Sequence, residues 1–239
     1  MSDAPTTSQN EAISMTAARR ALDELDALLH ARGRFAIGIE RPPWLLLLLV
    51  IAIAGFLYGL AMGSFAGRPL QALYSGLKVP LLLAVATLLC LPSFYVVNAI
   101  LGLRTRLEAA LHGILAAQAT LAITLASLSP VTLVFYLSSR VYSHAILLNG
   151  LIFLLATVAG QTTLTRHYRP LITENPRHRI NRRVWAISYV FVAVQMAWVL
   201  RPFVGSPDLE TGFFRENAWS NAYVVVFETV VEALRGGGE

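Results

Sequence analysis

Five stretches of about twenty predominantly apolar residues dominate this chain of 239 residues. A helix of about 20 residues spans the hydrocarbon core of a bilayer, which is about 30 Å thick. The stretches are Trp44–Ser64, Val79–Gly102, Leu107–Leu128, Val141–Thr162 and Val184–Phe203, and none has an Asp or Glu in its middle. They predict an all-α fold, a polytopic transmembrane helical bundle with about five membrane-spanning helices.

The composition agrees with a chain surrounded by lipid. Hydrophobic residues make up 56% of the sequence and charged residues only 14%, whereas a water-soluble domain carries about 25% charged residues. This excludes an ordinary soluble globule and most disordered chains. A single cysteine, Cys90, excludes a disulfide scaffold. The formal charge of +5 is too dispersed to indicate nucleic acid as a partner.

The charged residues divide the chain into three regions. Residues 1–43 are polar, and apolar residues recur at helical spacing over Ala12–Ala31, which predicts an amphipathic helix. Residues 44–203 hold the five spans and form the transmembrane domain. Residues 204–239 carry six acids against two arginines and are expected to form an interfacial tail.

Two proline positions modify this outline. Pro92 lies inside the second span and is expected to kink it, because proline lacks a backbone N–H. Ser129-Pro130 has the pattern of an N-cap followed by proline at the first helical position, which predicts a short helix over Val131–Leu137. Seven residues cannot cross a bilayer, so we expect this helix to lie in the interface or to dip back into the membrane.

The basic residues predict the orientation. With a cytoplasmic N-terminus, the cytoplasmic segments hold 13 basic residues and the opposite segments hold 6. Cytoplasmic loops of membrane proteins carry an excess of Lys and Arg. We therefore expect a multi-pass protein of the cell inner membrane, with its N-terminus cytoplasmic and its C-terminus extracytoplasmic.

Four glycines repeat at every fourth position in and after the first span: Gly55, Gly59, Gly63 and Gly67. Small residues at this spacing let two helix backbones approach closely in a membrane. The face is open to two interpretations. It forms a homo- or hetero-oligomer contact, or it packs against another helix of the same bundle, which is the interpretation we favour.

Neutral amides are the main polar side chains inside the spans. They are Asn98, Gln118, Asn149 and Gln195. Such groups usually hydrogen-bond a neighbouring helix, at about 0.6 kcal/mol each, and the alternative is that all four line one polar cavity. Because ionisable residues are missing from the span centres, a proton-driven transporter is disfavoured.

Arginines near the span ends are candidates for contact with anionic lipid. The loop Arg166–Arg183 contains Arg166, Arg169, Arg177, Arg179, Arg182 and Arg183. Each basic residue near an anionic surface contributes about 1 kcal/mol of attraction, although the same residues also set topology. Arg201 follows Trp198 and is either a snorkelling residue or a cation for a lipid headgroup or a tail carboxylate such as Asp208.

Catalytic and metal-binding patterns are missing from the sequence. It contains no HExxH, GxSxG, GxGxxG or Walker pattern. The histidines His112 and His144 have no Cys, Asp or Glu at ligand spacing. We therefore expect no catalytic residue, no metal, no cofactor and no enzymatic activity.

Two tracts carry a resemblance: Val79–Gly102 (VPLLLAVATLLCLPSFYVVNAILG) and Val192–Asn221 (VAVQMAWVLRPFVGSPDLETGFFRENAWSN). They resemble a group of uncharacterised bacterial polytopic membrane proteins. The layout is also similar to that of Yip1-type proteins, which have a cytosolic N-terminal region, five membrane helices and a short tail on the far side. Because the acidic-Leu-Tyr-Gly-Pro motif of eukaryotic Yip1 proteins is absent, this similarity concerns topology and implies no functional residue.

The leading functional hypothesis is a non-enzymatic integral membrane protein that organises or anchors partners. It rests on the glycine face, the charge-poor spans and the amphipathic helix. A small channel or permease component and a lipid-binding accessory protein are the alternatives. The expected partners are membrane lipid and a homo- or hetero-oligomeric neighbour, with no nucleic acid.

Overall fold

The computed structural model describes residues 43–205 and 211–214, and outside these ranges Thr16, Arg19, Arg20, Asp23, Glu24, residues 26–28, Phe35 and Val224. The amphipathic helix expected over Ala12–Ala31 and most of the expected tail therefore lie outside the described residues. Within the described part the chain forms helices and no strand. The all-α prediction is confirmed.

Within residues 43–205, six α-helices and two short 3-10 helices follow one another. They are α2 (Trp44–Gly63), η2 (Phe65–Gly67), α3 (Pro69–Ile100), η3 (Arg104–Arg106), α4 (Leu107–Ser127), α5 (Ser129–Ser138), α6 (Tyr142–Glu174) and α7 (His178–Val199).

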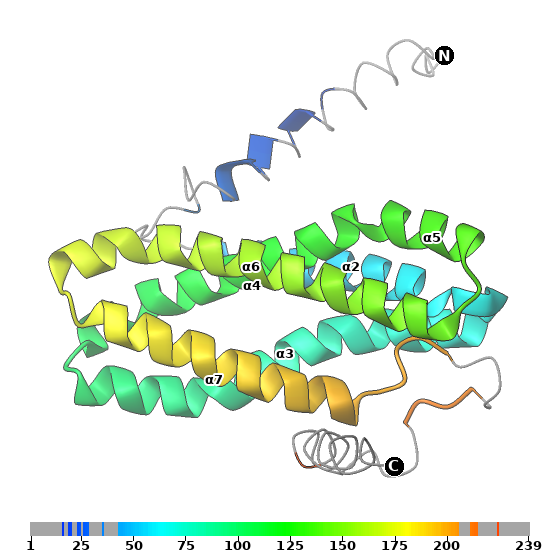
Figure 1. Ribbon diagram of the computed structural model, residues 1–239. Helices are drawn as coiled ribbons and strands as arrows, with labels where there is room; N and C mark the ends of the chain where they lie inside the picture. Colours follow the sequence, from blue (N-terminus) through cyan, green and yellow to red (C-terminus); the bar gives the residue numbers. More distant parts are fainter. Residues whose placement is uncertain are drawn as a thin grey trace, which may run out of the picture.

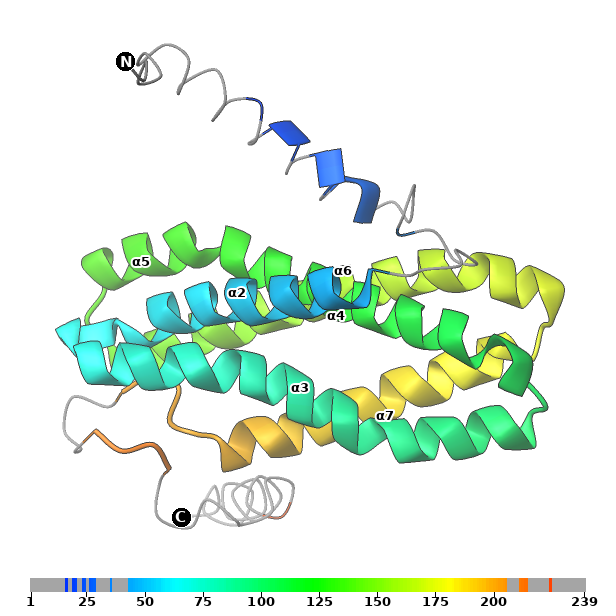
Figure 2. The same ribbon diagram turned by 180° about the vertical axis from the view of Figure 1, so that it is seen from behind.

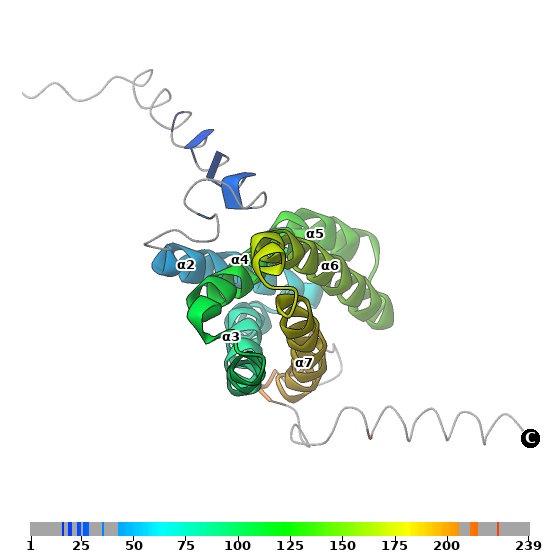
Figure 3. The same cartoon turned by 90° about the vertical axis from the view of Figure 1, so that its left-hand side faces the viewer.

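The helices lie side by side in an elongated bundle (Figure 1). The α3–α4 and α6–α7 connections lie at one end of it, and the α2–α3 and α5–α6 connections lie at the other (Figures 1 and 2). Helix α5 continues in the direction of α4, beyond a break at Leu128. Seen along its axis, the bundle has α3 and α7 on one side and α5 and α6 on the other (Figure 3).

In the part of the chain that the structure describes, four helical stretches are long and apolar enough to cross a membrane: Trp44–Gly63, Pro69–Ile100, Arg104–Ser138 and Tyr142–Glu174. This is what a multi-pass membrane protein requires. At 1.5 Å per residue, α3 and α6 are about 48–50 Å long and exceed the hydrocarbon core. Their outer faces carry exposed leucines such as Leu88 (64% exposed) and Leu147 (70%), as expected for helices in contact with lipid.

The fifth expected span, Val184–Phe203, lies mostly within α7 and is not among these four. The first six residues of α7, His178–Arg183, include three arginines, which leaves only 16 helical residues after them. The four-residue stretch after Val199 that we assigned to the span lies beyond the helix. The expected span is thus shorter as a helix than its apolar sequence suggested.

Pro92 does not end the second helix, and the short helix that includes Pro130 is longer than expected. Helix α3 runs from Pro69 to Ile100 as one element with Pro80 and Pro92 inside it. The short helix expected over Val131–Leu137 extends over ten residues as α5. Together with η3 and α4 it makes up the apolar stretch Arg104–Ser138, so it prolongs a candidate span.

Helices α2 and α3 pack closely along the glycine face. A Cβ atom added at Gly59 would lie 2.2 Å from the carbonyl oxygen of Ser75, and one at Gly63 would lie 2.6 Å from that of Gln71. At Gly55 the nearest atom, the nitrogen of Pro80, would be 3.3 Å away. Three of the four glycines thus lie against α3 of the same chain, whereas Gly67 has a φ of +69° and lies in the turn after α2.

Two apolar clusters fill the bundle. The first lies mainly between α2, α4 and α6 and includes Leu47, Tyr58 and Leu125. The second lies where α3, α4, α6 and α7 meet and includes Phe94 and Trp185, whose ring centroids are 5.4 Å apart. The candidate functional site described in the next subsection lies next to this second cluster.

The segment after α7 packs onto the first turns of α3. Gln71, Ser75 and Lys78 recur at i, i+4 and i+7 and are all fully buried. Lys78 Nζ donates to the carbonyl oxygen of Pro202 at 2.8 Å. Gln71 Nε2 donates to the same oxygen at 3.0 Å, and Ser75 donates to the carbonyl oxygen of Phe203. The ring of Phe213 also lies over Lys78, with Nζ 4.8 Å from its centroid.

Candidate functional site: the arginine-rich end

The two basic connections of the sequence meet at one end of the bundle. Figure 3 looks onto this end, where the α3–α4 and α6–α7 connections lie close to the viewer. We call the arginines of these connections and of the adjoining helix ends the arginine-rich end. They are Arg104, Arg106, Arg166, Arg169, Arg177, Arg179, Arg182 and Arg183, and all except the half-buried Arg182 are exposed.

Hydrogen bonds join the two connections. Arg106 Nε donates to Glu174 Oε1 at 2.9 Å, and the Nη2 atom of the same arginine lies 2.8 Å from that oxygen. Arg177 Nη1 donates to the carbonyl oxygen of Leu101 at 3.3 Å. An exposed ion pair stabilises little, about 0–1 kcal/mol. Its consequence here is geometric, because it holds the end of α6 beside η3.

Positive charge predominates at this end. Residues 101–108 and 165–183 contain eight arginines and two acids, Glu108 and Glu174, and Glu174 is already paired with Arg106. Charges concentrated at the end of a membrane helix bundle lie near the headgroup region, where anionic lipids attract them. The surface is therefore suited to phosphate-bearing headgroups.

Beneath the arginines lies a set of buried polar side chains, which we call the buried polar cluster: Asn98, Tyr168, His178 and Asn181, with Arg182 at its edge. The first four are 0–1% exposed. No hydrogen bond within the described protein reaches either amide atom of Asn98 or Asn181, the Tyr168 hydroxyl, His178 Nδ1 or Arg182 Nε.

The cluster draws its members from α3, α6 and α7. The Tyr168 and His178 rings are 6.3 Å apart. Phe94 on α3 contacts Trp185 on the antiparallel helix α7. Asn98 lies one helical turn after Phe94 and Asn181 lies one turn before Trp185, so both asparagines lie on the side toward the arginine-rich end. Helix periodicity therefore places the two asparagines at the same level of the α3–α7 contact.

The surroundings of His178 favour its neutral form. Burial lowers the pKa of its imidazole, the nearby Glu174 opposes this shift and Arg106 adds to it. A neutral imidazole provides one donor and one acceptor. The cluster thus offers both donors and acceptors. Leaving such a group unpaired in the interior costs about 1–3 kcal/mol, so these side chains favour water or a polar group of a ligand as partners.

The four amides predicted from the sequence lie in separate places. Asn149 Oδ1 accepts from the Tyr58 hydroxyl at 2.7 Å, and Asn149 Nδ2 donates to the Tyr136 hydroxyl at 2.6 Å. Gln118 Oε1 accepts from the Tyr189 hydroxyl at 2.9 Å. Asn98 belongs to the buried polar cluster, and Gln195 is half-buried on α7. The structure does not bring the four together around one cavity.

Asn149 connects three helices, which leads to a stability prediction. We expect Asn149→Leu to lower the free energy of unfolding by about 1–2 kcal/mol, because the Tyr58 and Tyr136 hydroxyls lose their shared partner and hydrogen bonds inside membranes are worth about 0.6–1.7 kcal/mol. Tyr58→Phe, which leaves the bond between Asn149 and Tyr136 intact, should cost less. Unfolding of the purified protein in mixed micelles measures both, and equal stability of Asn149→Leu and the unmodified protein would refute the role.

Arg201 lies at the opposite end of α7 from the arginine-rich end. Its guanidinium carbon is 3.6 Å from the centroid of the Trp198 ring, and the residue is half-buried. Asp208, the tail carboxylate named as a partner from the sequence, lies outside the described residues. The arrangement that the structure shows is a cation stacked on an aromatic ring.

Several residues of the site were not expected from the sequence. Tyr168 and Asn181 lie outside the predicted spans and were not singled out, and His178 counted only as a member of the basic loop Arg166–Arg183. The spacing of His178, Asn181, Trp185 and Tyr189 at intervals of three or four residues marks one face of α7. That periodicity could have indicated a buried helix face. It was not recognised because the arginines between these residues made the segment look like a polar loop.

The described part of the chain shows no metal site and no side chain placed as a nucleophile. It contains no group of three or more His, Cys, Asp or Glu side chains arranged to hold a metal ion. Cys90 is a buried free thiol in the apolar cluster around Trp185. Comparisons of the whole chain with protein-family models, with curated proteins and with solved structures found no match.

Proposed function

We propose that this chain is a non-enzymatic multi-pass membrane protein that binds anionic lipid headgroups at its arginine-rich end. The observation that carries the proposal is the convergence of two arginine-bearing connections over the buried polar cluster. The arginines attract negative charge from the bilayer surface. Their guanidinium groups donate charge-assisted hydrogen bonds to phosphate oxygens.

The proposal includes a location and an orientation. The arginine-rich end faces the cytoplasm, and the membrane is the bacterial inner membrane, because basic connections are retained on the cytoplasmic side. In this arrangement α7 is the fifth span. Its outer face supports that role, since Ile187, Phe191 and Val194 are 46–72% exposed. The N-terminus is then cytoplasmic and the C-terminus extracytoplasmic.

Lipid binding is preferred to partner organisation and to transport for reasons of packing. Gly55, Gly59 and Gly63 lie against α3, so this face is not offered to a second copy or another protein. Asn149 and Gln118 are engaged by tyrosines on neighbouring helices, so they do not support a shared polar path. The exposed arginines are the groups still suited to an external ligand.

The proposal predicts a loss of lipid affinity when charge is removed. In the triple variant Arg177→Gln, Arg179→Gln and Arg183→Gln, we expect the dissociation constant for phosphatidylglycerol to rise on the order of 10-fold to 100-fold, because each arginine contributes about 1 kcal/mol or less. Native mass spectrometry of the full-length protein titrated with this lipid measures the change.

A lysine series provides the matched control. Arg177→Lys, Arg179→Lys and Arg183→Lys keep the charge at the same three positions and should retain most of the affinity. Raising the salt concentration should weaken phosphatidylglycerol binding to the unmodified protein more than binding to the glutamine variant, which keeps five of the eight arginines. Equal affinity of the glutamine variant and the unmodified protein would refute the proposal.

A further inference from the structure

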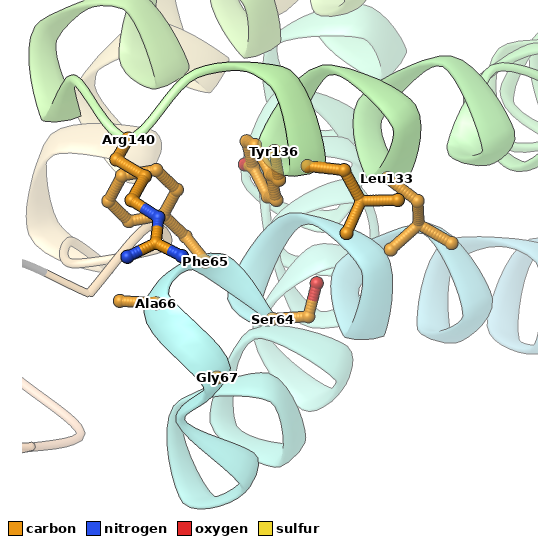
Figure 4. A pocket seen from close by; sticks show the side chains of 8 residues that line it. Ser64, Phe65, Ala66, Gly67, Leu133, Tyr136 and Arg140 are labelled. Carbon is orange, nitrogen blue, oxygen red and sulfur yellow. The ribbon is translucent and has the colours of Figure 1, made fainter.

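A cleft with a volume of about 760 Å³ opens at the end of the bundle opposite the arginine-rich end. We call it the rim cleft (Figure 4). One side is the turn after α2, and the other is the last turns of α5 with Arg140, which lies two residues beyond its end. Its lining residues are Ser64, Phe65, Ala66, Gly67, Leu133, Tyr136, Leu137 and Arg140.

The chain reversal after α2 shapes the floor. Ala66 and Gly67 both have positive φ values, 59° and 69°, which turn the backbone sharply between α2 and α3. A Cβ atom at Gly67 would meet no other atom within 4 Å. The turn therefore leaves open space where a regular helix would have placed side chains.

The walls are apolar, and their hydroxyls are already engaged. The Phe65 and Tyr136 rings meet edge to face at 5.1 Å, and Leu133 and Leu137 are 43% and 87% exposed. The Tyr136 hydroxyl donates to the carbonyl oxygen of Met62 at 3.0 Å, and Ser64 Oγ donates to that of Ala61 at 2.8 Å. The cleft thus offers hydrocarbon contact along most of its length.

Arg140 gives the cleft a single cationic group. Its side chain is exposed, and in Figure 4 its guanidinium lies over the turn at Phe65 and Ala66. The lining residues described by the structure include no carboxylate. Since the candidate span Arg104–Ser138 ends two residues earlier and the next begins at Tyr142, Arg140 lies where a membrane segment meets the headgroup region.

We infer that the rim cleft binds one anionic phospholipid molecule from the surrounding bilayer. Its phosphate contacts the Arg140 guanidinium, which can donate two parallel hydrogen bonds to phosphate oxygens. An acyl chain lies against Leu133 and Leu137, which are 43% and 87% exposed. The cleft volume falls within the range of about 300–1,000 Å³ that is typical of ligand pockets. This site is separate from the arginine-rich end and shares no residue with it.

The experiment counts lipids bound to the full-length protein by native mass spectrometry, with phosphatidylglycerol and phosphatidylcholine as probes. It uses the triple glutamine variant as background, so that binding at the arginine-rich end is weakened and the effect of a change at Arg140 is easier to resolve. We expect one phosphatidylglycerol molecule to remain bound. Arg140→Gln should weaken that binding at least 10-fold, whereas Arg140→Lys should weaken it less.

Two further variants separate a lipid site from a simple surface charge. Arg68→Gln removes a cation at the same end but outside the cleft and should leave binding unchanged. Leu133→Trp enlarges an exposed wall residue and should weaken binding while Arg140 is intact. The inference is overturned if Arg140→Gln retains the lipid, if Arg68→Gln loses it equally, if Leu133→Trp has no effect, or if phosphatidylcholine binds as well as phosphatidylglycerol.

Discussion

Replacing Gly59 by alanine is expected to destabilise the bundle by about 2–3 kcal/mol or more, because the added methyl group has no room. Its Cβ would lie 2.2 Å from the Ser75 carbonyl oxygen and 2.7 Å from the Gly76 Cα. Both neighbours are backbone atoms, so a side-chain rotation cannot relieve the clash. The helices α2 and α3 must separate instead, and their close contact along the glycine face is lost.

The glycines provide their own graded controls. Gly150→Ala is the matched substitution, since Gly150 also lies within a helix but has open space around its Cβ position. It should leave stability unchanged or raise it by up to about 1 kcal/mol. Gly55→Ala should have an intermediate effect, because its nearest neighbour is 3.3 Å away. Unfolding in mixed micelles gives the order, and equal stability of Gly59→Ala and Gly150→Ala would contradict the packing.

Reversing the charge of Lys78 is expected to release the segment after α7 from α3. Lys78 is fully buried, and its ammonium faces the Pro202 carbonyl oxygen and the face of the Phe213 ring. Both are negative ends of dipoles or quadrupoles. A carboxylate at position 78 would face the same groups with the wrong sign, and an unpaired buried charge costs about 3–5 kcal/mol.

Lys78→Met is the control for Lys78→Glu. Methionine keeps most of the length of the side chain and removes the charge, and such replacements are often neutral or stabilising. Hydrogen exchange of residues 199–205 measures the outcome. We expect a large increase for Lys78→Glu and a small one for Lys78→Met. Unchanged exchange in Lys78→Glu would show that Lys78 does not hold this segment.

The apolar stretches of the sequence predicted the helices well because a bilayer imposes a simple requirement. Trp44–Ser64, for example, differs from α2 by one residue. The prediction was less accurate where helices extend beyond the hydrocarbon core. Helix α3 begins ten residues before the expected Val79, because Gln71, Ser75 and Lys78 can be helical while they bind the segment at Pro202–Phe203.

Only part of the candidate site could be predicted from the sequence. The arginines of the loop Arg166–Arg183 were recognisable because charge near a span end carries topological meaning. That Arg104 and Arg106 lie at the same end follows from the up-and-down order of the helices. The burial of Asn98 and Asn181 was not predictable, since it depends on the register of α3 against α7, which the Phe94–Trp185 contact reveals.

Lys78 illustrates the same difficulty. In the sequence it precedes an apolar run and counts as a loop cation that helps to set topology. In the structure it is 0% exposed because residues far away in the chain, Pro202 and Phe213, cover it. Composition and periodicity describe one helix at a time, so they do not reveal a burial created by a distant segment.

The central claim is that the arginine-rich end contacts anionic headgroups. Photocrosslinking tests it most directly, with the full-length protein in bilayers that contain phosphatidylglycerol or phosphatidylcholine, each keeping its own headgroup and carrying the same photoreactive group next to it. The account predicts that phosphatidylglycerol adducts are enriched in residues 101–108 and 165–183, and that phosphatidylcholine labels these segments weakly. Equal labelling of these segments by the two lipids, or their absence from the phosphatidylglycerol adducts, would contradict it.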